Sequence, residues 1–278
     1  MYKLIREALR EDIGPGDITT SAVIPVKKNI RAEIIAKESG IIGGLLIAKE
    51  VFYLLDKSIK FRSLVKEGEK VKKGKRLAAI KGNARAILRG ERVALNFMQR
   101  ISGIATETNR CVEKLKGFKT RILDTRKTPA GWRWLDKYGV RLGGGKNHRF
   151  GLYDMVLIKD NHIVLSLGIK EAVKAARKKC PGKKIEVEVK NFKELLEAVD
   201  AGADIVMLDN MNLKKITEAL KIINKKCKVE VSGNVPFSLL PGLARLGVDY
   251  ISLGRLTHSP KALDISLGIP RGYRRKDY

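Results

Sequence analysis

The sequence predicts an α/β protein in which an N-terminal α+β unit precedes a (β/α) barrel short of eight strands. Beyond residue 120, short apolar segments alternate with amphipathic ones at intervals of about 20 to 25 residues, the length of a βα unit. Ahead of them, stretches punctuated by Gly68, Gly74 and Gly82 predict short strands. With 44% hydrophobic and 31% charged residues, the composition is that of a globular protein. No apolar run approaches the roughly 18 residues that a membrane span needs.

The elements of the N-terminal unit follow from hydrophobic periodicity. An amphipathic helix is predicted over residues 1–12, and it does not resemble a signal peptide. A strand over residues 30–36 and a helix over residues 43–55 follow it. A long helix over residues 91–115 is apolar on more than one side, which predicts that it is buried, and Arg92 lies in its first turn.

The barrel is predicted over residues 106–267, after an N-terminal domain over residues 1–105. The tail, residues 268–278, is expected to pack on the N-terminal domain. Between the later strands, segments such as FKELLEAVDAGA have the period of amphipathic helices, as in a parallel barrel. The predicted strands cover residues 120–124, 155–159, 185–189, 205–208, 229–231 and 250–253.

Polar residues and glycines follow the predicted strands where each strand ends. In a parallel barrel the functional site is built at these carboxyl ends. Charges that directly end an apolar strand need a partner if they are buried. The set is therefore a candidate site: Asp124, Thr125, Arg126, Lys127, Lys159, Asp160, Asn161, His162, Glu188, Lys190, Asp209, Asn210, Ser232, Gly233, Asn234, Leu253, Gly254 and Arg255.

The early strands supply the cations of this site. The cations of the candidate site are Arg126, Lys127, Arg149 and Lys159, and His148 lies next to Arg149 in sequence. Guanidinium groups bind carboxylates and phosphates through two parallel hydrogen bonds. The cluster therefore predicts a substrate with more than one acidic group.

The later strands supply carboxylates and glycine turns. Glu188 and Asp209 are candidate ligands of Mg²⁺, which is usually bound through one or two protein carboxylates together with substrate phosphates. The turns VSGNV and SLGRLTHS present backbone N–H groups at predicted helix starts, where a phosphate binds well. A phosphorylated ligand bound to Mg²⁺ is therefore expected beside the acidic one.

The overall charge is strongly positive, with 57 Lys and Arg against 30 Asp and Glu, a formal net charge of +27. Such a field attracts anions of any kind. The basic residues do not form a stripe with interleaved aromatic residues, which disfavours nucleic-acid binding. Three cysteines without CxxC spacing predict reduced thiols, and we expect a cytoplasmic protein without a membrane anchor.

Longer motifs resemble the quinolinate phosphoribosyltransferases, the decarboxylating nicotinate-nucleotide pyrophosphorylases of NAD biosynthesis. They occur in order between about residue 10 and residue 267: EDIGPGDITT, ERVALNFMQRISGIATET, DTRKTPAGWR, GGGKNHRFGLYDMVLIKDNHI, EVEV, MLDN, VSGNV and ISLGRLTHS. The resemblance implies an incomplete, about seven-stranded α/β barrel with an N-terminal sandwich domain. It also implies a homo-oligomer, either a dimer or a hexamer, and a pentosyl transfer that needs Mg²⁺ and no organic cofactor.

The same resemblance implies a role for each matching residue. Quinolinate is expected at Arg126, His148, Arg149 and Lys159, with Arg92 reaching the site of the neighbouring subunit. Phosphoribosyl pyrophosphate and Mg²⁺ are expected at Lys127, Lys159, Glu188 and Asp209, which would carry catalysis. The phosphate end and the adjoining loop are expected at Thr125, Ser232, Gly233, Asn234, Leu253, Gly254, Arg255 and His258.

Three other functions stay open on the sequence. A molybdenum-locus homologue of the same family would use a different acceptor. A nicotinate phosphoribosyltransferase would bind an acceptor with one carboxylate, and the number of cations argues for two. A basic nucleic-acid-binding barrel would carry its cations on an outer face.

Overall fold

The computed structural model describes residues 2–270 and divides into two compact units. The first contains the described residues up to Glu107, the segment Trp134–Gly143 and the described residues from Pro260 onward. The second contains Thr108–Arg133 and Gly144–Ser259. The observed division therefore differs from two consecutive domains over 1–105 and 106–267. Of the predicted tail, residues 271–278 lie outside the described residues.

An antiparallel four-stranded sheet forms the centre of the first unit. Its order is β12 (Ile265–Gly268), β1 (Asn29–Ala36), β5 (Arg76–Asn83) and β3 (Lys60–Ser63). Along β1, alternate side chains are buried, as expected for a sheet with one covered face. Two short strands, β2 (Gly40–Ile41) and β4 (Lys70–Val71), pair beside it.

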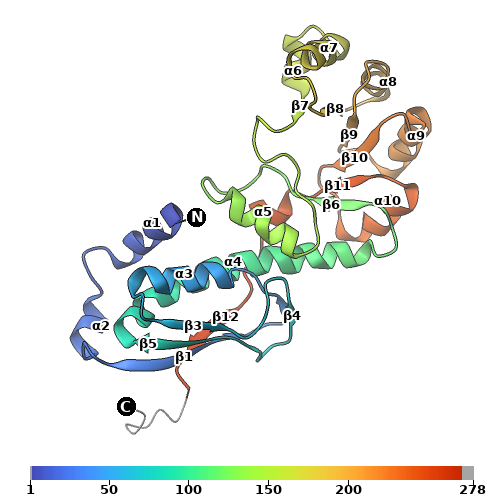
Figure 1. Cartoon of the computed structure of the whole chain (residues 1–278). Coiled ribbons are helices and arrows are strands. Elements are labelled where there is room, and N and C mark those ends of the chain that lie inside the picture. Colours follow the sequence, from blue (N-terminus) through green and yellow to red (C-terminus); the bar gives the residue numbers. More distant parts are fainter. Residues whose placement is uncertain (1, 271–278) are drawn as a thin grey trace. The chain divides into compact units, whose positions relative to one another are not determined.

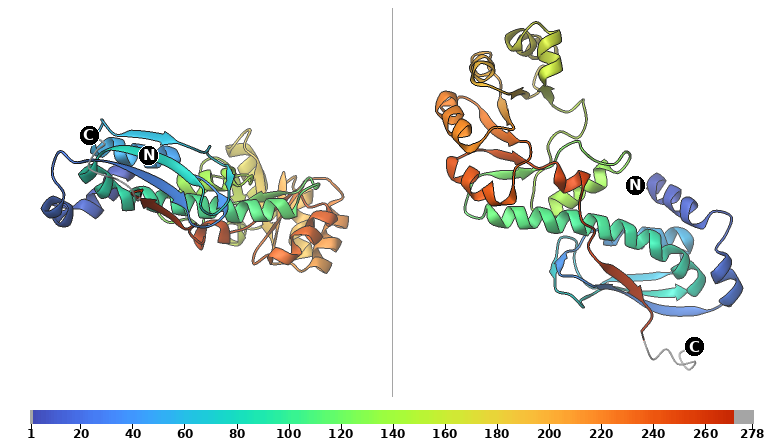
Figure 2. Two further views of the ribbon diagram at one scale, coloured as in Figure 1. Left: turned by 90° about the horizontal axis from the view of Figure 1, so that it is seen from below. Right: turned by 180° about the vertical axis from the view of Figure 1, so that it is seen from behind.

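Helices cover one face of this sheet (Figures 1 and 2). Helix α3 (Leu45–Leu55) places Phe52 against Phe61 of β3, with ring centroids 6.1 Å apart. The unit also contains α1 (Tyr2–Ile13) and α2 (Ile18–Val23). Strand β12 comes from the end of the described chain, so one edge strand of the sheet is supplied by a segment far from the others in sequence.

The long helix α4 (Ala84–Lys114) begins seven residues before the predicted start at Glu91. The prediction of short strands as far as Leu88 is wrong for residues 84–88, because β5 ends at Asn83 and the Asn83 side chain accepts a hydrogen bond from Ala86 N at 3.3 Å. Arg92 therefore lies in the third turn, not the first, and its side chain is exposed. Buried residues such as Leu95, Met98 and Ile101 confirm that much of the helix is enclosed.

Six parallel strands form the sheet of the second unit. In sheet order they are β6 (Arg121–Leu123), β11 (Tyr250–Ser252), β10 (Lys228–Ser232), β9 (Ile205–Asp209), β8 (Ile185–Val189) and β7 (Val156–Ile158). All six were predicted, within two residues at each end. An isolated parallel bridge between Leu123 and Lys146 lies at the outer side of β6, the place of a seventh strand. The prediction of an incomplete α/β barrel is confirmed, with six strands and this bridge.

The connecting helices alternate with the strands (Figure 1). In chain order they are α5 (Arg133–Leu142), α6 (Asp160–Leu165), α7 (Ile169–Lys179), α8 (Phe192–Asp200), α9 (Leu213–Ile223), the 3₁₀ helix η1 (Phe237–Leu239), α10 (Leu240–Leu246) and α11 (Arg255–His258). Asn191 and Asn212 cap α8 and α9 by accepting hydrogen bonds at 2.9 Å from Glu194 N and Lys215 N. From Trp134 onward, α5 belongs to the first unit.

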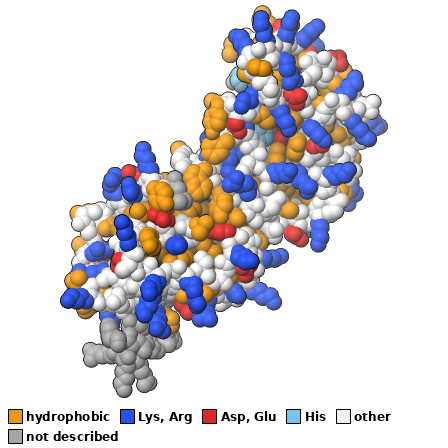
Figure 3. Space-filling model, viewed as in Figure 1, with side chains coloured by type: hydrophobic (Ala, Val, Ile, Leu, Met, Phe, Trp, Pro, Cys, Tyr) orange, Lys and Arg blue, Asp and Glu red, His pale blue; other side chains and the backbone are white. Residues whose placement is uncertain are grey.

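Lysine and arginine side chains are spread over the visible face of both units, with acidic and apolar groups between them (Figure 3). This distribution agrees with the absence of a basic stripe in the sequence. None of the helices within residues 2–270 combines the length and the apolar character needed to cross a membrane.

Candidate active site

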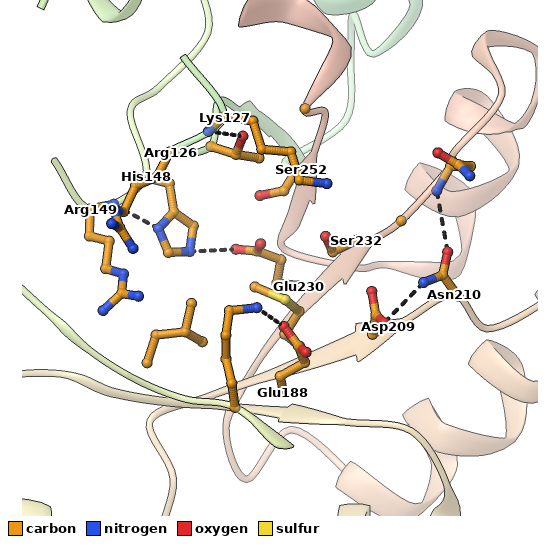
Figure 4. Close-up of a pocket in the computed structure, with 17 residues that line it drawn as sticks. Arg126, Lys127, His148, Arg149, Glu188, Asp209, Asn210, Glu230, Ser232 and Ser252 are labelled. Carbon is orange, nitrogen blue, oxygen red and sulfur yellow. Dashed lines mark hydrogen bonds and ion pairs between the residues drawn. The ribbon is translucent and has the colours of Figure 1, made fainter. Parts of the chain in front are cut away.

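A cavity of about 560 Å³ opens at the carboxyl ends of the barrel strands, and it is lined by residues of the second unit (Figure 4). Thirteen of the predicted site residues line it: Thr125, Arg126, Lys127, His148, Arg149, Lys159, Glu188, Asp209, Asn210, Ser232, Gly233, Asn234 and Gly254. Four further lining residues were not predicted: Leu157, Met207, Glu230 and Ser252.

The period of two along each strand explains which residues reach the cavity. Side chains two positions apart share a face of a strand. Thus Leu157 and Lys159, Met207 and Asp209, and Glu230 and Ser232 form three such pairs on β7, β9 and β10 or at their ends. Searching only the strand ends misses the lower member of each pair.

Arg149 and His148 lie at one end of the cavity in Figure 4. The Arg149 side chain is largely buried, and its Nη1 donates to the Met155 carbonyl at 3.3 Å. Burial and the neighbouring Arg126 lower the pKa of Arg149. Its Nε is buried and has no hydrogen-bond partner among the described residues. A bound anion would both give this nitrogen an acceptor and offset the repulsion between the two guanidinium groups.

Carboxylates occupy the floor and the opposite end of the cavity. Glu188 forms an ion pair with Lys159, so one oxygen of the carboxylate is held by the ammonium group. Asp209 accepts a hydrogen bond from Asn210 Nδ2 at 2.9 Å. Both carboxylates come from adjacent strands, β8 and β9. They can offer their remaining lone pairs to a cation or to water molecules bound to it.

The turn after β10 depends on a glycine. Gly233 has φ +117°, and a Cβ atom built there would lie 2.3 Å from Asn210 Oδ1. Asn210 itself adopts a left-handed conformation, with φ +53°. Its Oδ1 accepts a hydrogen bond of 3.4 Å from Asn234 N. Asn210 therefore joins the Asp209 carboxylate to the glycine turn, and this link was not visible in the sequence.

The buried Asp124 holds the loop that carries His148. Asp124 Oδ1 accepts a hydrogen bond of 2.9 Å from His148 N, and its other oxygen accepts one from Asn147 Nδ2. The imidazole Nδ1 of His148 in turn accepts from Arg149 N at 2.7 Å. This strand-end aspartate thus positions the loop and does not line the cavity.

Two buried glutamates lie beside the imidazole of His148. Its Nε2 is 2.9 Å from Glu186 Oε2 and 3.6 Å from Glu230 Oε2, and the two glutamates are only 0% and 1% exposed. Burial, followed by the neighbouring Glu186, raises the pKa of Glu230 well above its usual value. Both residues could have been found in the sequence, because each is a glutamate between apolar neighbours, in IEVEV and in VEV. A carboxylate inside a fully buried strand needs a partner, which marks such a position as a candidate for the site.

Besides Asp124, eight predicted residues do not line the cavity: Asp160, Asn161, His162, Lys190, Leu253, Arg255, His258 and Arg92. Leu253 is buried, and Arg255 donates to the Val235 carbonyl at 2.6 Å. The exposed His258 is near the lining, since a Cβ atom at Gly254 would lie 3.2 Å from its Cδ2. Arg92 belongs to the first unit.

Comparison with known proteins decides the family. Residues 17–102 match the model of the quinolinate phosphoribosyl transferase N-terminal domain, and residues 104–268 match that of the C-terminal domain. The chain belongs to the quinolinate phosphoribosyltransferase family. The predicted resemblance is confirmed.

Similar family members cover almost the whole chain. A probable nicotinate-nucleotide pyrophosphorylase (carboxylating) of Bacillus subtilis is 46% identical over 97% of this chain and 93% of its own length. Quinolinate phosphoribosyltransferase (decarboxylating) 1 of Nicotiana glauca is 42% identical over 96% of this chain and 81% of its own length. The crystal structure of NadC from Streptococcus pyogenes superposes with a TM-score of 0.92 at 40% identity, covering 96% of this chain and 95% of that one.

Proposed function

We propose that this protein transfers the phosphoribosyl group of phosphoribosyl pyrophosphate to quinolinate and removes the 2-carboxylate as CO₂. The products are nicotinate mononucleotide, CO₂ and pyrophosphate, a step of NAD biosynthesis. The observation that carries the proposal is a single cavity with a buried, partly unpaired Arg149 at one end and the carboxylate-bearing turn of Asp209 at the other. Membership of the family supports it.

The acceptor belongs at the Arg149 end of the cavity. Arg126, Arg149 and Lys159 offer three permanent or near-permanent cations there, and quinolinate brings two carboxylates. Because Lys159 is already paired with Glu188, the single carboxylate of nicotinate would leave one of the two guanidinium groups without a counter-ion in a partly buried site, which costs free energy. The number of cations therefore favours a dicarboxylate.

The donor belongs at the Asp209 end, where backbone N–H groups of the Gly233 turn can bind a phosphate. Mg²⁺ fits here, because Glu188 and Asp209 offer hard oxygen ligands from adjacent strands. When bound, Mg²⁺ would neutralise charge on the diphosphate. Water and phosphate oxygens would complete its coordination.

The protein residues would act by orientation and electrostatics. The pyridine nitrogen attacks the anomeric carbon, and the bond to pyrophosphate breaks. Lys127 and Lys159 would stabilise the charge that develops on the leaving group, while Glu188 and Asp209 would lie near the ribose as it becomes cationic. After transfer, the C2 carboxylate leaves as CO₂, the electron pair of the broken bond stays on C2, where the adjacent positively charged pyridinium nitrogen stabilises it, and C2 then takes up a proton.

We further propose that the active form is a homo-oligomer in which Arg92 serves the cavity of a neighbouring subunit. Arg92 is an exposed residue of the first unit, whereas every residue that lines the cavity belongs to the second. Large apolar side chains at Leu152, Tyr153 and Leu165 are more than 70% exposed. An interface between copies would bury such groups. The reduced thiols of Cys111, Cys180 and Cys227 support the further proposal of a cytoplasmic location.

A substrate comparison tests the function. The purified protein is given Mg²⁺, phosphoribosyl pyrophosphate and either quinolinate labelled in its 2-carboxylate or nicotinate. We expect labelled CO₂ and nicotinate mononucleotide in equal amounts from quinolinate. Turnover of nicotinate but not quinolinate would refute the proposal, and turnover of neither would indicate another acceptor. Loss of turnover on chelation of Mg²⁺, restored by adding it back, tests the metal.

Mixing variants tests the shared site. Arg92→Ala and Lys159→Ala should each be inactive alone, because each lacks one cation for the acceptor. If Arg92 of one subunit serves the cavity of its neighbour, a mixed oligomer contains some cavities that have both Arg92 and Lys159, and part of the activity returns. No recovery after verified subunit exchange would contradict the sharing of Arg92.

A further inference from the structure

Three side chains from separate parts of the barrel meet at the wall of the cavity: His148 from a loop, Glu186 from β8 and Glu230 from β10. His148 Nε2 is 2.9 Å from Glu186 Oε2 and 3.6 Å from Glu230 Oε2. The side chain of His148 is 7% exposed, and both carboxylates are essentially inaccessible. Burying such a cluster costs free energy unless its polar atoms are paired in hydrogen bonds.

The hydrogen bonds of the imidazole fix where its proton lies. Nδ1 accepts from the backbone N–H of Arg149 at 2.7 Å, and therefore carries no proton itself. An imidazolium would place two N–H groups against each other at that distance. The ring proton is then on Nε2, where the Glu186 carboxylate accepts it.

We propose that Glu186, with Glu230 beside it, is a positioning residue that holds His148 as the neutral Nε2–H tautomer. In the proposed quinolinate reaction, on which this role rests, the acceptor carboxylates are then bound by guanidinium and ammonium groups and not by an imidazolium. His148 belongs to the wall of the cavity as an oriented neutral ring. The sequence had grouped it with the cations.

The arrangement also connects Glu186 to Arg149. Glu186 orients the imidazole ring, the ring accepts from the Arg149 backbone, and Asp124 holds the His148 backbone from the other side. The peptide that carries the Arg149 guanidinium is therefore fixed by a continuous set of hydrogen bonds. Loss of the carboxylate at Glu186 should allow the imidazole ring to turn. The acceptor should then bind more weakly, while the rates of the chemical steps should change less.

A metal ion is the competing occupant of this cluster, because the three residues could each supply one ligand atom, all within 4.8 Å of one another. A metal at Nε2 would require that nitrogen to be unprotonated. The hydrogen-bonded arrangement and the metal-bound arrangement therefore predict opposite states of the same atom. Spectroscopy of His148 separates them.

The chain has three histidines, so nitrogen-15 labelling of histidine gives few NMR signals, and a His148→Asn variant assigns the relevant one. At neutral pH we expect His148 to show the Nε2–H pattern in the otherwise unmutated protein. Glu186→Met, which keeps side-chain length and removes the acceptor, should lose that pattern. Glu186→Gln should keep it, because its amide oxygen still accepts from Nε2–H. Glu197→Met, a carboxylate elsewhere in the same unit that accepts from Ile169 N and Lys170 N, is the matched control and should leave it unchanged.

Kinetics provide the second readout. We expect Glu186→Met to raise KM for quinolinate by about tenfold and to change kcat by less than about threefold. Glu186→Gln should restore most of the affinity. An imidazolium pattern in the unmutated protein, an unchanged His148 signal in Glu186→Met, or Zn²⁺ binding at Nε2 would each overturn the proposal. If quinolinate is not a substrate, the proposed function fails, while the NMR comparison still decides the role of Glu186.

Discussion

Replacing Gly233 by alanine should damage both the fold and the donor end of the cavity. The backbone at this position, with φ +117°, is in a region that residues with a Cβ rarely adopt, at a cost of about 1–3 kcal/mol. The new Cβ would also lie 2.3 Å from Asn210 Oδ1 and 2.8 Å from its Cγ, so the asparagine side chain must move.

Movement of Asn210 removes two hydrogen bonds. These are the 2.9 Å bond to Asp209 and the 3.4 Å bond from Asn234 N, each worth about 0.5–1.5 kcal/mol. Together with the backbone strain, the expected loss of unfolding free energy is about 2–6 kcal/mol. Calorimetry should show Tm lowered by about 5–15 °C. Because the turn is proposed to bind the donor phosphate, KM for phosphoribosyl pyrophosphate should rise at least about tenfold.

Two further variants isolate the cause. Gly242→Ala, within α10, has no atom within 4 Å of its added Cβ and should stabilise the protein slightly, by up to about 1 kcal/mol. Combining Gly233→Ala with Asn210→Ala removes the colliding side chain. In the Asn210→Ala background, Gly233→Ala should therefore lower the free energy of unfolding only by the backbone strain at residue 233. A Gly233→Ala protein with unchanged Tm and unchanged KM would refute the reasoning.

Three other predictions concern charged side chains of the site and of the core. Lys159→Met should lower kcat/KM about 10²–10³-fold, because the substitution removes a cation from the cavity and leaves Glu188 without its ion pair. A loss of less than tenfold in steady-state kinetics would count against the role of Lys159. Since the pKa of Glu230 is raised in the fold above its ordinary 4.5, its contribution to stability is complete below that value and is lost as pH rises towards the folded pKa. The Tm of Glu230→Gln relative to the unmutated protein should therefore increase between about pH 5 and pH 8, and a difference that is constant or falls with pH would contradict this shift. Asp136→Ala should cost about 3–5 kcal/mol in urea unfolding, because buried Asp136 holds Arg100 through two hydrogen bonds of 2.8 and 2.9 Å; a loss below about 1 kcal/mol would show that the pair contributes little.

Much of the barrel could be predicted because its signals are local. Strands such as β8, Ile185–Val189, are buried on both faces and stand between amphipathic helices of regular length. The carboxyl ends of parallel strands meet at one edge, so residues such as Lys159, Glu188 and Asp209 could be assigned to one site without knowing any distance. Eleven residues predicted in this way line a common cavity, together with His148 and Arg149 from a loop.

Other features required contacts between distant segments. The start of α4 at Ala84 was missed because the glycine pattern before it resembled further strands, while a side-chain cap at Asn83 decides the boundary. The division of the chain into units was also not linear, since β12 pairs with β1 and residues 134–143 belong with the first unit. Pairing of this kind is set by complementary surfaces, which periodicity does not reveal.

The sequence by itself determined the α/β class, the barrel strands, the cationic and acidic halves of the site and the family. It could do so because these properties depend on residue type, spacing and the shared direction of the strands. Only the tertiary structure decided that His148 lies between Glu186 and Glu230 and that Asn210 packs against Gly233. Protonation and loop shape there depend on distances across the barrel, where desolvation and hydrogen bonds act over a few ångströms.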